Sequence, residues 1–311
     1  MDYTLFLFSF LLSSILHFTI QKVFIYFNKF EEINFRSSHK KLATTTGGIG
    51  VFLTLFVFSV YYYLNKVEIF DYSLFIPLGI MFVVGVYDDL YKAHFKLKFF
   101  LQIIVAKILI DQGFVINNYY GLFGLNEIPW ILAQLTTVFV FLVLVNAINF
   151  IDGVDGLAIS EVIKIILIFE LFSEKSTPFS ITSIILISSL LPLYYFNYKK
   201  NHKVFLGDGG SLLLGTFVSI YVFYVLSSDY EFNYGFYINK TLFAVLVLLY
   251  PLLDLLRVFI IRIKKNKSPF EADQNHIHHL IIKRFKPFYS VFIIITLSLM
   301  ISYLVLLLVT K

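Results

Sequence analysis

Asn146-Ala-Ile-Asn-Phe-Ile-Asp-Gly-Val-Asp-Gly-Leu-Ala158 is the stretch around which the chain is organised, because it sets polar side chains between two apolar segments, residues 131–145 and 157–172. Its polar side chains recur at every third position, at Asn146, Asn149, Asp152 and Asp155. This spacing predicts a row on one face of a tight turn or a short 3₁₀ segment, suited to binding a polar ligand. A plain polar loop is the alternative; a calcium loop is disfavoured because the further oxygen ligands of an EF-hand are missing.

The composition is that of a membrane protein. The chain has 311 residues, 59% of them hydrophobic and 14% charged, and its mean hydropathy is +0.82. Soluble domains contain ~25% charged residues, and many apolar runs here reach the ~20 residues that cross a ~30 Å hydrocarbon core. The sequence therefore predicts an all-α polytopic integral membrane protein with one membrane-embedded domain over residues 1–311. Cysteine is absent, so disulfides are excluded.

Ten transmembrane helices are expected, near residues 3–27, 47–64, 73–87, 97–113, 129–147, 157–173, 178–196, 209–228, 240–261 and 288–310. The first is interpreted as a retained span, because neither a basic leader nor a small-residue cleavage site accompanies it. Of the 25 Lys and Arg residues, 17 fall on one side of this arrangement, in residues 28–46, 88–98, 148–156, 197–208 and 262–287. Only four fall on the other side, so the basic side is predicted to face the cytoplasm, with both termini outside. The same bias accounts for the net charge of +5 without a nucleic-acid partner.

The first cytoplasmic segment combines basic residues with a glycine-rich helix start. Arg36, His39, Lys40 and Lys41 precede Gly47-Gly-Ile-Gly50. Free N–H groups and the helix dipole make such a start suitable for phosphate. Anchoring to lipid headgroups by the basic residues is the alternative.

Two adjacent carboxylates, Asp88 and Asp89, follow an apolar span. Carboxylates at a membrane edge are unfavourable unless they are paired, bound to metal or hydrated. Lys92 lies four residues after Asp88, so a continuous helix would place both on the same face. An ion-paired helix end is the structural alternative to a functional site.

A single carboxylate, Asp208, lies among glycines just before the next basic-side span. It suits Mg²⁺, which keeps several waters and takes few protein oxygens. A helix N-cap is the alternative. Phe205, three residues earlier, is a candidate for stacking on a base.

The last cytoplasmic segment contains three histidines within four residues, His276, His278 and His279. They are candidates for binding a diphosphate or a metal, and phosphate is simpler because no further zinc ligands are evident. Asp254 and Arg257 lie three apart inside a span, where an intrahelical pair is expected.

Together these segments resemble one family, the polyprenyl-phosphate N-acetylhexosamine-1-phosphate transferases of bacterial cell-surface glycan synthesis. The resemblance extends from Asn34 to Leu280 and keeps motif order. It rests on R-S-S-H at 36–39, D-D-x-x-K at 88–92, N-A-x-N-x-x-D-G-x-D-G-L-A at 146–158, F-x-G-D-x-G-S at 205–211 and H-I-H-H at 276–279. The last form is more similar to the N-acetylglucosamine-1-phosphate branch than to the peptidoglycan pentapeptide branch.

The resemblance implies a role for each motif. Asp208 would coordinate Mg²⁺ or Mn²⁺, and Asp88 and Asp89 would act near the lipid phosphate. The nucleotide-sugar site would be lined by Lys92, Asn149, Asp152, Asp155 and Phe205. Asn146 is a further candidate for substrate binding, and Asp152 and Asp155 are also candidates for a catalytic role. Phosphate or diphosphate contacts would come from Arg36, His39, His276, His278 and His279. Two departures from the family pattern bear on the donor site, since Thr44–Thr46 replace a usual Pro and Arg and Gln274 replaces a usual Arg.

The implied reaction uses a UDP-N-acetylhexosamine as donor and undecaprenyl phosphate as acceptor. A lipid-phosphate oxygen would attack the sugar-bearing phosphorus and UMP would leave, in the inner membrane with the site facing the cytoplasm. Direct attack and a two-step route through an aspartyl-phosphate both remain open. The pentapeptide branch is one alternative function and an ion or solute transporter is another, although transporter sites usually lie near the bilayer midplane. Membrane lipid and a second copy of the chain are further candidate partners.

Overall fold

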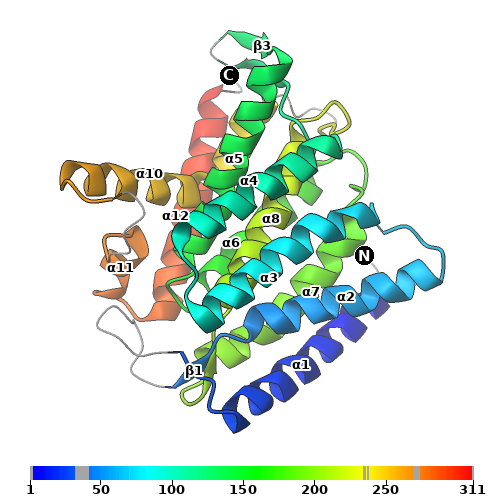
Figure 1. Ribbon diagram of the computed structural model, residues 1–311. Helices are drawn as coiled ribbons and strands as arrows, with labels where there is room; N and C mark the ends of the chain where they lie inside the picture. Colours follow the sequence, from blue (N-terminus) through cyan, green and yellow to red (C-terminus); the bar gives the residue numbers. More distant parts are fainter. Residues whose placement is uncertain are drawn as a thin grey trace. The chain divides into compact units, whose positions relative to one another are not determined.

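The computed structural model describes residues 3–31, 42–69, 71–122, 124–233, 236, 238–268 and 274–309. Helices dominate these residues, which confirms the predicted all-α class (Figure 1). Each predicted span coincides with a helix or, for residues 240–261, with two. The chain divides into two compact units, residues 1–98 with 178–214 and residues 99–177 with 215–311. The prediction of a single membrane domain stays a prediction.

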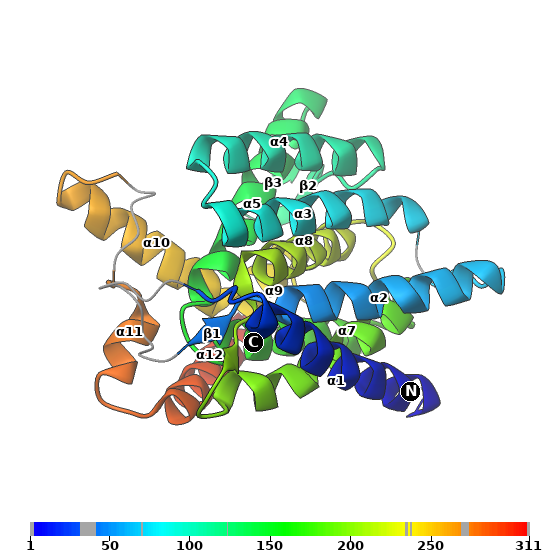
Figure 2. The same cartoon turned by 60° about the horizontal axis from the view of Figure 1, so that its bottom comes forward.

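The first unit is built on three helices that pack against one another, α1 (Tyr3–Tyr26), α2 (Gly47–Leu64) and α7 (Ser180–Tyr198) (Figure 2). It also contains the 3₁₀ turn η1 (Tyr72–Leu74) and α3 (Phe75–Tyr91). Two short strands, β1 (Ala43–Thr44) and β4 (Lys203–Val204), complete it, and α4 and α8 begin here.

A seam of small polar residues joins α1 to α7. The hydroxyls of Ser9 and Ser188 are hydrogen-bonded, and Ser13 Oγ donates to the carbonyl oxygen of Ser189 at 2.8 Å. Both α1 serines are fully buried. In a bilayer, small residues let helices approach closely and hydrogen bonds replace the hydrophobic drive that lipid removes. This seam explains why α1, although largely apolar, has a defined partner.

The parallel pairing of β1 with β4 brings two distant segments together at one end of the first unit. The backbone N–H of Gly47 donates to Phe205 O at 2.9 Å, and that of Gly48 donates to Leu206 O at 2.8 Å. The start of α2 and the chain before α8 therefore meet. Both segments were predicted to lie on the basic side, which stays a prediction.

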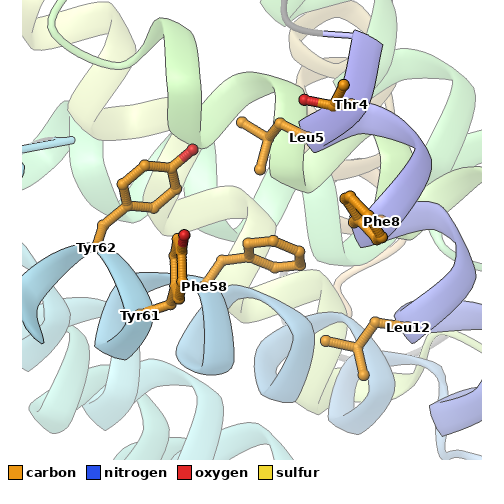
Figure 3. Close-up of a pocket in the computed structure, with 7 residues that line it drawn as sticks. All are labelled: Thr4, Leu5, Phe8, Leu12, Phe58, Tyr61 and Tyr62. Carbon is orange, nitrogen blue, oxygen red and sulfur yellow. The ribbon is translucent and has the colours of Figure 1, made fainter. Parts of the chain in front are cut away.

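An open pocket of about 580 Å³ lies at the other end of α2 (Figure 3). It is lined by Thr4, Leu5, Phe8, Leu12, Phe58, Tyr61 and Tyr62. None of these side chains is acidic, and none is a lysine, arginine or histidine. Tyr61 lies roughly 20 Å along the helix from Gly47, at 1.5 Å per residue. The pocket is therefore separate from the glycine-rich start of α2.

The second unit contains most of α4 (Phe95–Asp111) and the later part of α8 (Gly207–Val225). Its other helices are α5 (Trp130–Ile151), α6 (Leu157–Phe172), α9 (Lys240–Val247), α10 (Leu249–Lys264), α11 (Ile277–Ile282) and α12 (Pro287–Val309). The strands β2 (Asn118–Leu122) and β3 (Leu125–Glu127) form an antiparallel hairpin. Asn117, Asn118 and Gly121 in this loop are residues that favour turns, which is consistent with the hairpin.

The hairpin is tied to neighbouring loops of the second unit that the sequence assigned to the same, outer side. Tyr120 Oη donates to Leu226 O at 2.9 Å, and the amide of Asn239 donates to Tyr120 O. Lys240 Nζ donates to Ser227 O at 2.5 Å. These loops are therefore in contact, and their assignment to the outer side stays a prediction.

A buried ion pair lies within α6. Lys164 Nζ is 2.5 Å from Glu161 Oε2 and 3.3 Å from Ser298 Oγ of α12. Glu161 is fully buried and Lys164 is 8% exposed. Charges inside a membrane protein are tolerated when they face the bundle interior and pair with each other. The pair therefore explains how α6 buries Glu161 and Lys164 in a largely apolar helix.

Seven helices of the described chain are long and apolar enough to cross a membrane: α1, α2, η1 with α3, α5, α7, α8 and α12. The α9–α10 pair passes the same test together but bends by 75° at Leu248. The remaining two predicted spans, α4 and α6, have 17 and 16 residues. A polytopic membrane protein is confirmed, and the number of ten crossings stays a prediction.

Candidate active site

Asp89 caps the start of α8 in the first unit. Its Oδ1 accepts a hydrogen bond from the backbone N–H of Asp208, and its Oδ2 accepts one from Gly209, each at 3.0 Å. The first N–H groups of a helix have no partner within the helix, and a carboxylate there also meets the positive end of the dipole. The D-D motif and the F-x-G-D-x-G-S motif, 119 residues apart, are therefore joined directly.

Lys98, in the first turn of α4, bridges the other two carboxylates of this group. Its Nζ lies 2.6 Å from Asp88 Oδ2 and 2.8 Å from Asp208 Oδ2. The side chains of Asp88 and Lys98 are 14% and 18% exposed, and that of Asp208 is 30% exposed. We call Asp88, Asp89, Lys98 and Asp208 the acidic cluster. It is partly open to solvent, so a phosphate or a hydrated ion has access to it.

The backbone at Gly207 is fitted to this cluster. Gly207 has φ +74°, and a Cβ there would lie 2.7 Å from Asp89 Oδ2 and 3.1 Å from Thr45 Cβ. Only glycine adopts this conformation without strain and also leaves room for the carboxylate. The first glycine of the F-x-G-D-x-G-S motif therefore sets the distance between Asp89 and α8.

The alternative of an ion-paired helix end, with Lys92 on the same face as Asp88, is not what the structure shows. Helix α3 ends at Tyr91, and Lys92 is its C-cap with φ 56°, in the left-handed region. The helical spacing that would place Lys92 above Asp88 therefore stops one residue too early. Asp88 binds Lys98 instead, a residue that sequence reasoning assigned no role. Its only signal was a lysine in the first turn of an apolar helix, outside every motif.

The row of four polar residues in the second unit spans a helix end and the turn after it. Asn146 and Asn149 belong to α5, Asp152 is its C-cap, and Asp155 lies in the turn before α6. Asn146 Nδ2 donates to Gln102 Oε1 of α4 at 2.8 Å. The predicted tight turn is found only in the second half of the row, at residues 152–156, because the α-helix continues to Ile151. Asn146 is thereby engaged between helices, and Asn149, Asp152 and Asp155 lie at the end of α5 and in the turn.

The turn at Gly153 packs against the histidine segment. A Cβ on Gly153 would lie 3.1 Å from His278 Nε2 and 3.5 Å from His279 Cε1. Phe150 contacts His276 edge-on, with ring centroids 5.8 Å apart. The D-G-x-D-G motif and the H-I-H-H motif therefore meet within the second unit. We call His276, His278 and His279 the histidine cluster.

The three histidines differ in environment. His278 is fully buried, His276 is 5% exposed, and His279 is partly exposed. Burial, followed by the neighbouring His279, lowers the pKa of His278 to about 3, so this ring is neutral at physiological pH. His278 therefore contacts a ligand as a neutral hydrogen-bonding group rather than as a cation.

The expected Asp254–Arg257 pair is also wrong. Asp254 Oδ2 lies 2.6 Å from His276 Nδ1, and its Oδ1 accepts a hydrogen bond from the N–H of Ile277 at 2.6 Å. Arg257 donates to the carbonyl oxygen of Asn275. Tertiary contact with α11 outcompetes the local pair because a buried carboxylate gains more from a histidine and a backbone N–H together.

The two groups of acids differ in their suitability for Mg²⁺. In the acidic cluster, three carboxylates lie around one bound ammonium, so negative charge remains for a divalent ion with oxygen ligands. Asp254, His276 and His278 also lie close enough to hold an ion. Their nitrogens do not suit Mg²⁺, and both Asp254 oxygens already accept hydrogen bonds. The acidic cluster is the better fit.

Residues 71–226 match the family model described as Glycosyl transferase family 4. The chain belongs to glycosyl transferase family 4. The matched region contains the acidic cluster and the turn at Gly153, and it ends before the histidine cluster. Family membership makes the chain a transferase, so the transporter alternative is set aside.

Curated relatives of this family member extend the similarity to most of the chain. An undecaprenyl-phosphate alpha-N-acetylglucosaminyl 1-phosphate transferase of Pasteurella multocida is 30% identical over 285 residues, covering 85% of this chain and 74% of the relative. Proteins of the same name from Salmonella typhi and Escherichia coli K12 are each 27% identical, covering 93% of this chain and 78% of theirs. The similarity therefore includes the segments on both sides of the matched family region.

Arg36 and His39 lie outside the described residues. Phe205 is described, and its backbone joins β4 to β1 through a 2.8 Å hydrogen bond from its N–H to Thr44 O. Thr44 and Thr46, two of the residues that depart from the family pattern, are fully buried and their hydroxyls lie 3.1 Å apart. Thr44 and Thr46 are therefore packed in the interior, whereas Thr45 lies beside Gly207.

Proposed function

We propose that the chain transfers N-acetylhexosamine 1-phosphate, most directly N-acetylglucosamine 1-phosphate, from a UDP-sugar to undecaprenyl phosphate with release of UMP. Family membership and the shared name of its relatives support this activity over the pentapeptide branch. The reaction would be the first membrane step of cell-surface polysaccharide synthesis. The identities of the nucleotide, the sugar and the lipid are all part of what we propose.

The observation behind the proposal is the acidic cluster. Lys98 draws Asp88 and Asp208 to within hydrogen-bond distance of one ammonium group, and Asp89 fixes the helix that supplies Asp208. Phosphoryl transfer needs little covalent chemistry from the protein beyond positioning and charge stabilisation. A cluster of carboxylates beside one lysine supplies both for a phosphate and a divalent ion.

Mg²⁺ or Mn²⁺ would be held by Asp208 with the neighbouring carboxylates, and when bound it would offset charge on the phosphates. Asp88 would orient the lipid phosphate or remove its last proton, since a phosphate monoester with a second pKa near ~6 is mostly dianionic at neutral pH. Lys98 limits repulsion between Asp88 and Asp208. Asn149, Asp152, Asp155, Lys92 and Phe205 would bind the UDP-sugar, and the histidine cluster its diphosphate.

The site is proposed to face the cytoplasm from the inner membrane of a bacterium. UDP-sugars are found in the cytoplasm, and cytoplasmic loops are the ones enriched in Lys and Arg. Within each unit, the segments predicted to lie there meet at one end, as Ala43 and Lys203 do in the first and Gly153 and His278 in the second.

The decisive experiment follows the leaving nucleotide. Purified protein with undecaprenyl phosphate, UDP-N-acetylglucosamine and Mg²⁺ should release UMP and form a lipid-linked diphosphate sugar. Attack at phosphorus leaves UMP, whereas attack at the sugar carbon leaves UDP. EDTA should stop the reaction, and added Mg²⁺ or Mn²⁺ should restore it. Release of UDP would refute the reaction class.

The choice of sugar needs a panel of donors. UDP-N-acetylglucosamine, UDP-N-acetylgalactosamine and the pentapeptide-bearing UDP-N-acetylmuramate should be compared at equal concentration. We expect the first to give the highest kcat/KM. UMP from the pentapeptide donor alone would move the chain to that branch.

A further inference from the structure

Two side chains on one face of α10 reach the histidine cluster. Asp254 meets the Nδ1 of His276 at 2.6 Å, and Tyr250 Oη lies 3.1 Å from the Nδ1 of His278. Tyr250 and Asp254 are four residues apart, so they lie one above the other on the helix. Asp254 is fully buried and Tyr250 is 6% exposed. Neither residue belongs to a motif that the sequence analysis singled out for function.

The contacts of His276 define its tautomer. Asp254 Oδ2 accepts from Nδ1, and on the other side Arg262 Nη2 lies 3.5 Å from Nε2. A guanidinium group only donates, so Nε2 is the nitrogen that bears the lone pair and Nδ1 carries the proton. Both ring nitrogens are thereby engaged with protein groups. His276 therefore has a structural role, and His278 is the histidine available to contact a ligand.

The contacts of His278 give the opposite tautomer. The only hydrogen bond of the Tyr250 hydroxyl among the described residues is to His278 Nδ1, so a satisfied Tyr250 must donate to it. The proton of the neutral ring then lies on Nε2. Nε2 is buried and has no hydrogen-bond partner in the described chain. It faces the turn at Gly153, where a Cβ would lie only 3.1 Å away.

A buried N–H donor without a partner is unfavourable unless a ligand uses it. The turn beside it carries Asp152, and the partly exposed His279 ring packs on His278 with centroids 4.3 Å apart. A phosphate oxygen is a suitable acceptor, because charge-assisted hydrogen bonds are the strongest available to a neutral imidazole. A metal is a poorer occupant of this position, because the nitrogen that points to the turn, His278 Nε2, carries the proton. The nitrogen with the lone pair, Nδ1, faces Asp254 instead.

We propose that Tyr250 and Asp254 are positioning residues that hold His278 and His276 so that the Nε2–H of His278 is presented to a phosphate oxygen of the nucleotide-sugar donor. The proposal rests on the proposed function and assigns the α10 residues a part in donor recognition. Asp254 acts by fixing His276 and the start of α11 through Ile277. Tyr250 acts by fixing the tautomer of His278.

Kinetics with UDP-N-acetylglucosamine test the proposal. Tyr250→Phe should lower kcat/KM for the donor about 10-fold, and Asp254→Asn about 10- to 100-fold, the range found for groups that orient metal-ligating histidines and taken here for a phosphate-binding one. KM for undecaprenyl phosphate should stay within twofold of wild type. In a His278→Ala background, Tyr250→Phe should cost less than twofold further, because its partner is gone.

Tyr230→Phe is the matched control for Tyr250→Phe. Tyr230 is fully buried in the same unit and its hydroxyl donates to Phe169 O at 2.9 Å, so one buried hydrogen bond is lost in each variant. We expect Tyr230→Phe to keep kcat/KM within twofold of wild type. Asp111→Asn, at an exposed pair with Lys107, is the corresponding control for Asp254→Asn.

Histidine ring ¹⁵N shifts give a readout that does not require turnover. His278 should show the Nε2–H form and His276 the Nδ1–H form. In Tyr250→Phe, His278 should populate both tautomers. The opposite tautomers, or an unchanged kcat/KM in Tyr250→Phe, would overturn the proposal. So would equal losses with and without His278. If the wild-type protein releases no UMP at all, the proposed function itself fails, which is a different result.

Discussion

At the scale of single residues, the chemistry of this chain is set by unequal surroundings of identical side chains. Asp89 gives both oxygens to the backbone of α8, whereas Asp88 and Asp208 share Lys98 and stay partly exposed. The same holds for histidine, since His276 is engaged on both nitrogens and His278 on one. Roles can therefore be tested one residue at a time.

Asp208→Asn tests the metal assignment. Losing one ligand charge from a site with few protein ligands should reduce kcat about 100-fold or more, while the protein stays folded. The measurement is UMP release across a Mg²⁺ titration, with Asp111→Asn as a carboxylate control. Near-normal turnover at every Mg²⁺ concentration would move the ligand role to Asp88 or Asp89.

His278 predicts a pH dependence of stability. Its pKa is about 3 in the fold and 6.5 ordinarily, so between these values the unfolded chain binds a proton that the folded chain excludes. Stability should therefore fall as pH drops below 6.5, by about 2 kcal/mol at pH 5 from this group. His278→Gln should flatten the thermal-midpoint profile between pH 7 and pH 5. The exposed His94→Gln should follow wild type, and identical profiles for all three proteins would contradict the prediction.

At the scale of elements, the candidate site residues are positioned by helix ends, whereas loops position them in many enzymes. The start of α8 is capped by Asp89 from the end of α3, and the end of α5 leads into the turn at Gly153 that packs on α11. Each junction depends on a position without a side chain, because a Cβ would enter the space of a functional group. Packing of this kind tolerates little displacement.

Gly207→Ala tests the first junction. The left-handed backbone alone should destabilise the variant by roughly 1–2 kcal/mol. The Cβ would also displace Asp89, so activity should fall at least 10-fold. Gly113→Ala is the matched control, because Gly113 has φ +93° but no atom within 4 Å of an added Cβ. The control should share the stability loss and keep its activity; equal activities would show that the close approach to Asp89 is unimportant.

At the scale of the whole molecule, the distribution of charge predicts an orientation in the membrane. Most Lys and Arg residues fall on one predicted side, and the motif residues fall there too. Long apolar helices supply the crossings, and the described loops of each unit group by predicted side. The orientation is therefore a property of the chain that a single labelling experiment can test.

Cysteine labelling tests this orientation, and the chain offers a clean background because it contains no cysteine. In intact cells, Asn117→Cys should react with an impermeant thiol reagent, whereas Asn201→Cys should react only after permeabilisation. Both positions are exposed, so reactivity reports sidedness. The reverse pattern would overturn the orientation and the cytoplasmic site with it.

The sequence alone determined the membrane class, the helix positions and the order of the motifs, because hydropathy and local spacing are properties of contiguous residues. Asp88, Asp89 and Asp208 were identified in this way. Fold class and family resemblance are both confirmed. The assignment of roles within the site stays a prediction.

Tertiary structure decided which side chains meet. Lys98 replaced Lys92 as the partner of Asp88 because α3 ends one residue before the i,i+4 spacing is complete. Asp254 binds His276 rather than Arg257 because α11 brings an imidazole and a backbone N–H to the same carboxylate. Such pairings join residues on different helices, so they cannot be read from local propensity. They depend on where helices end and on which faces pack.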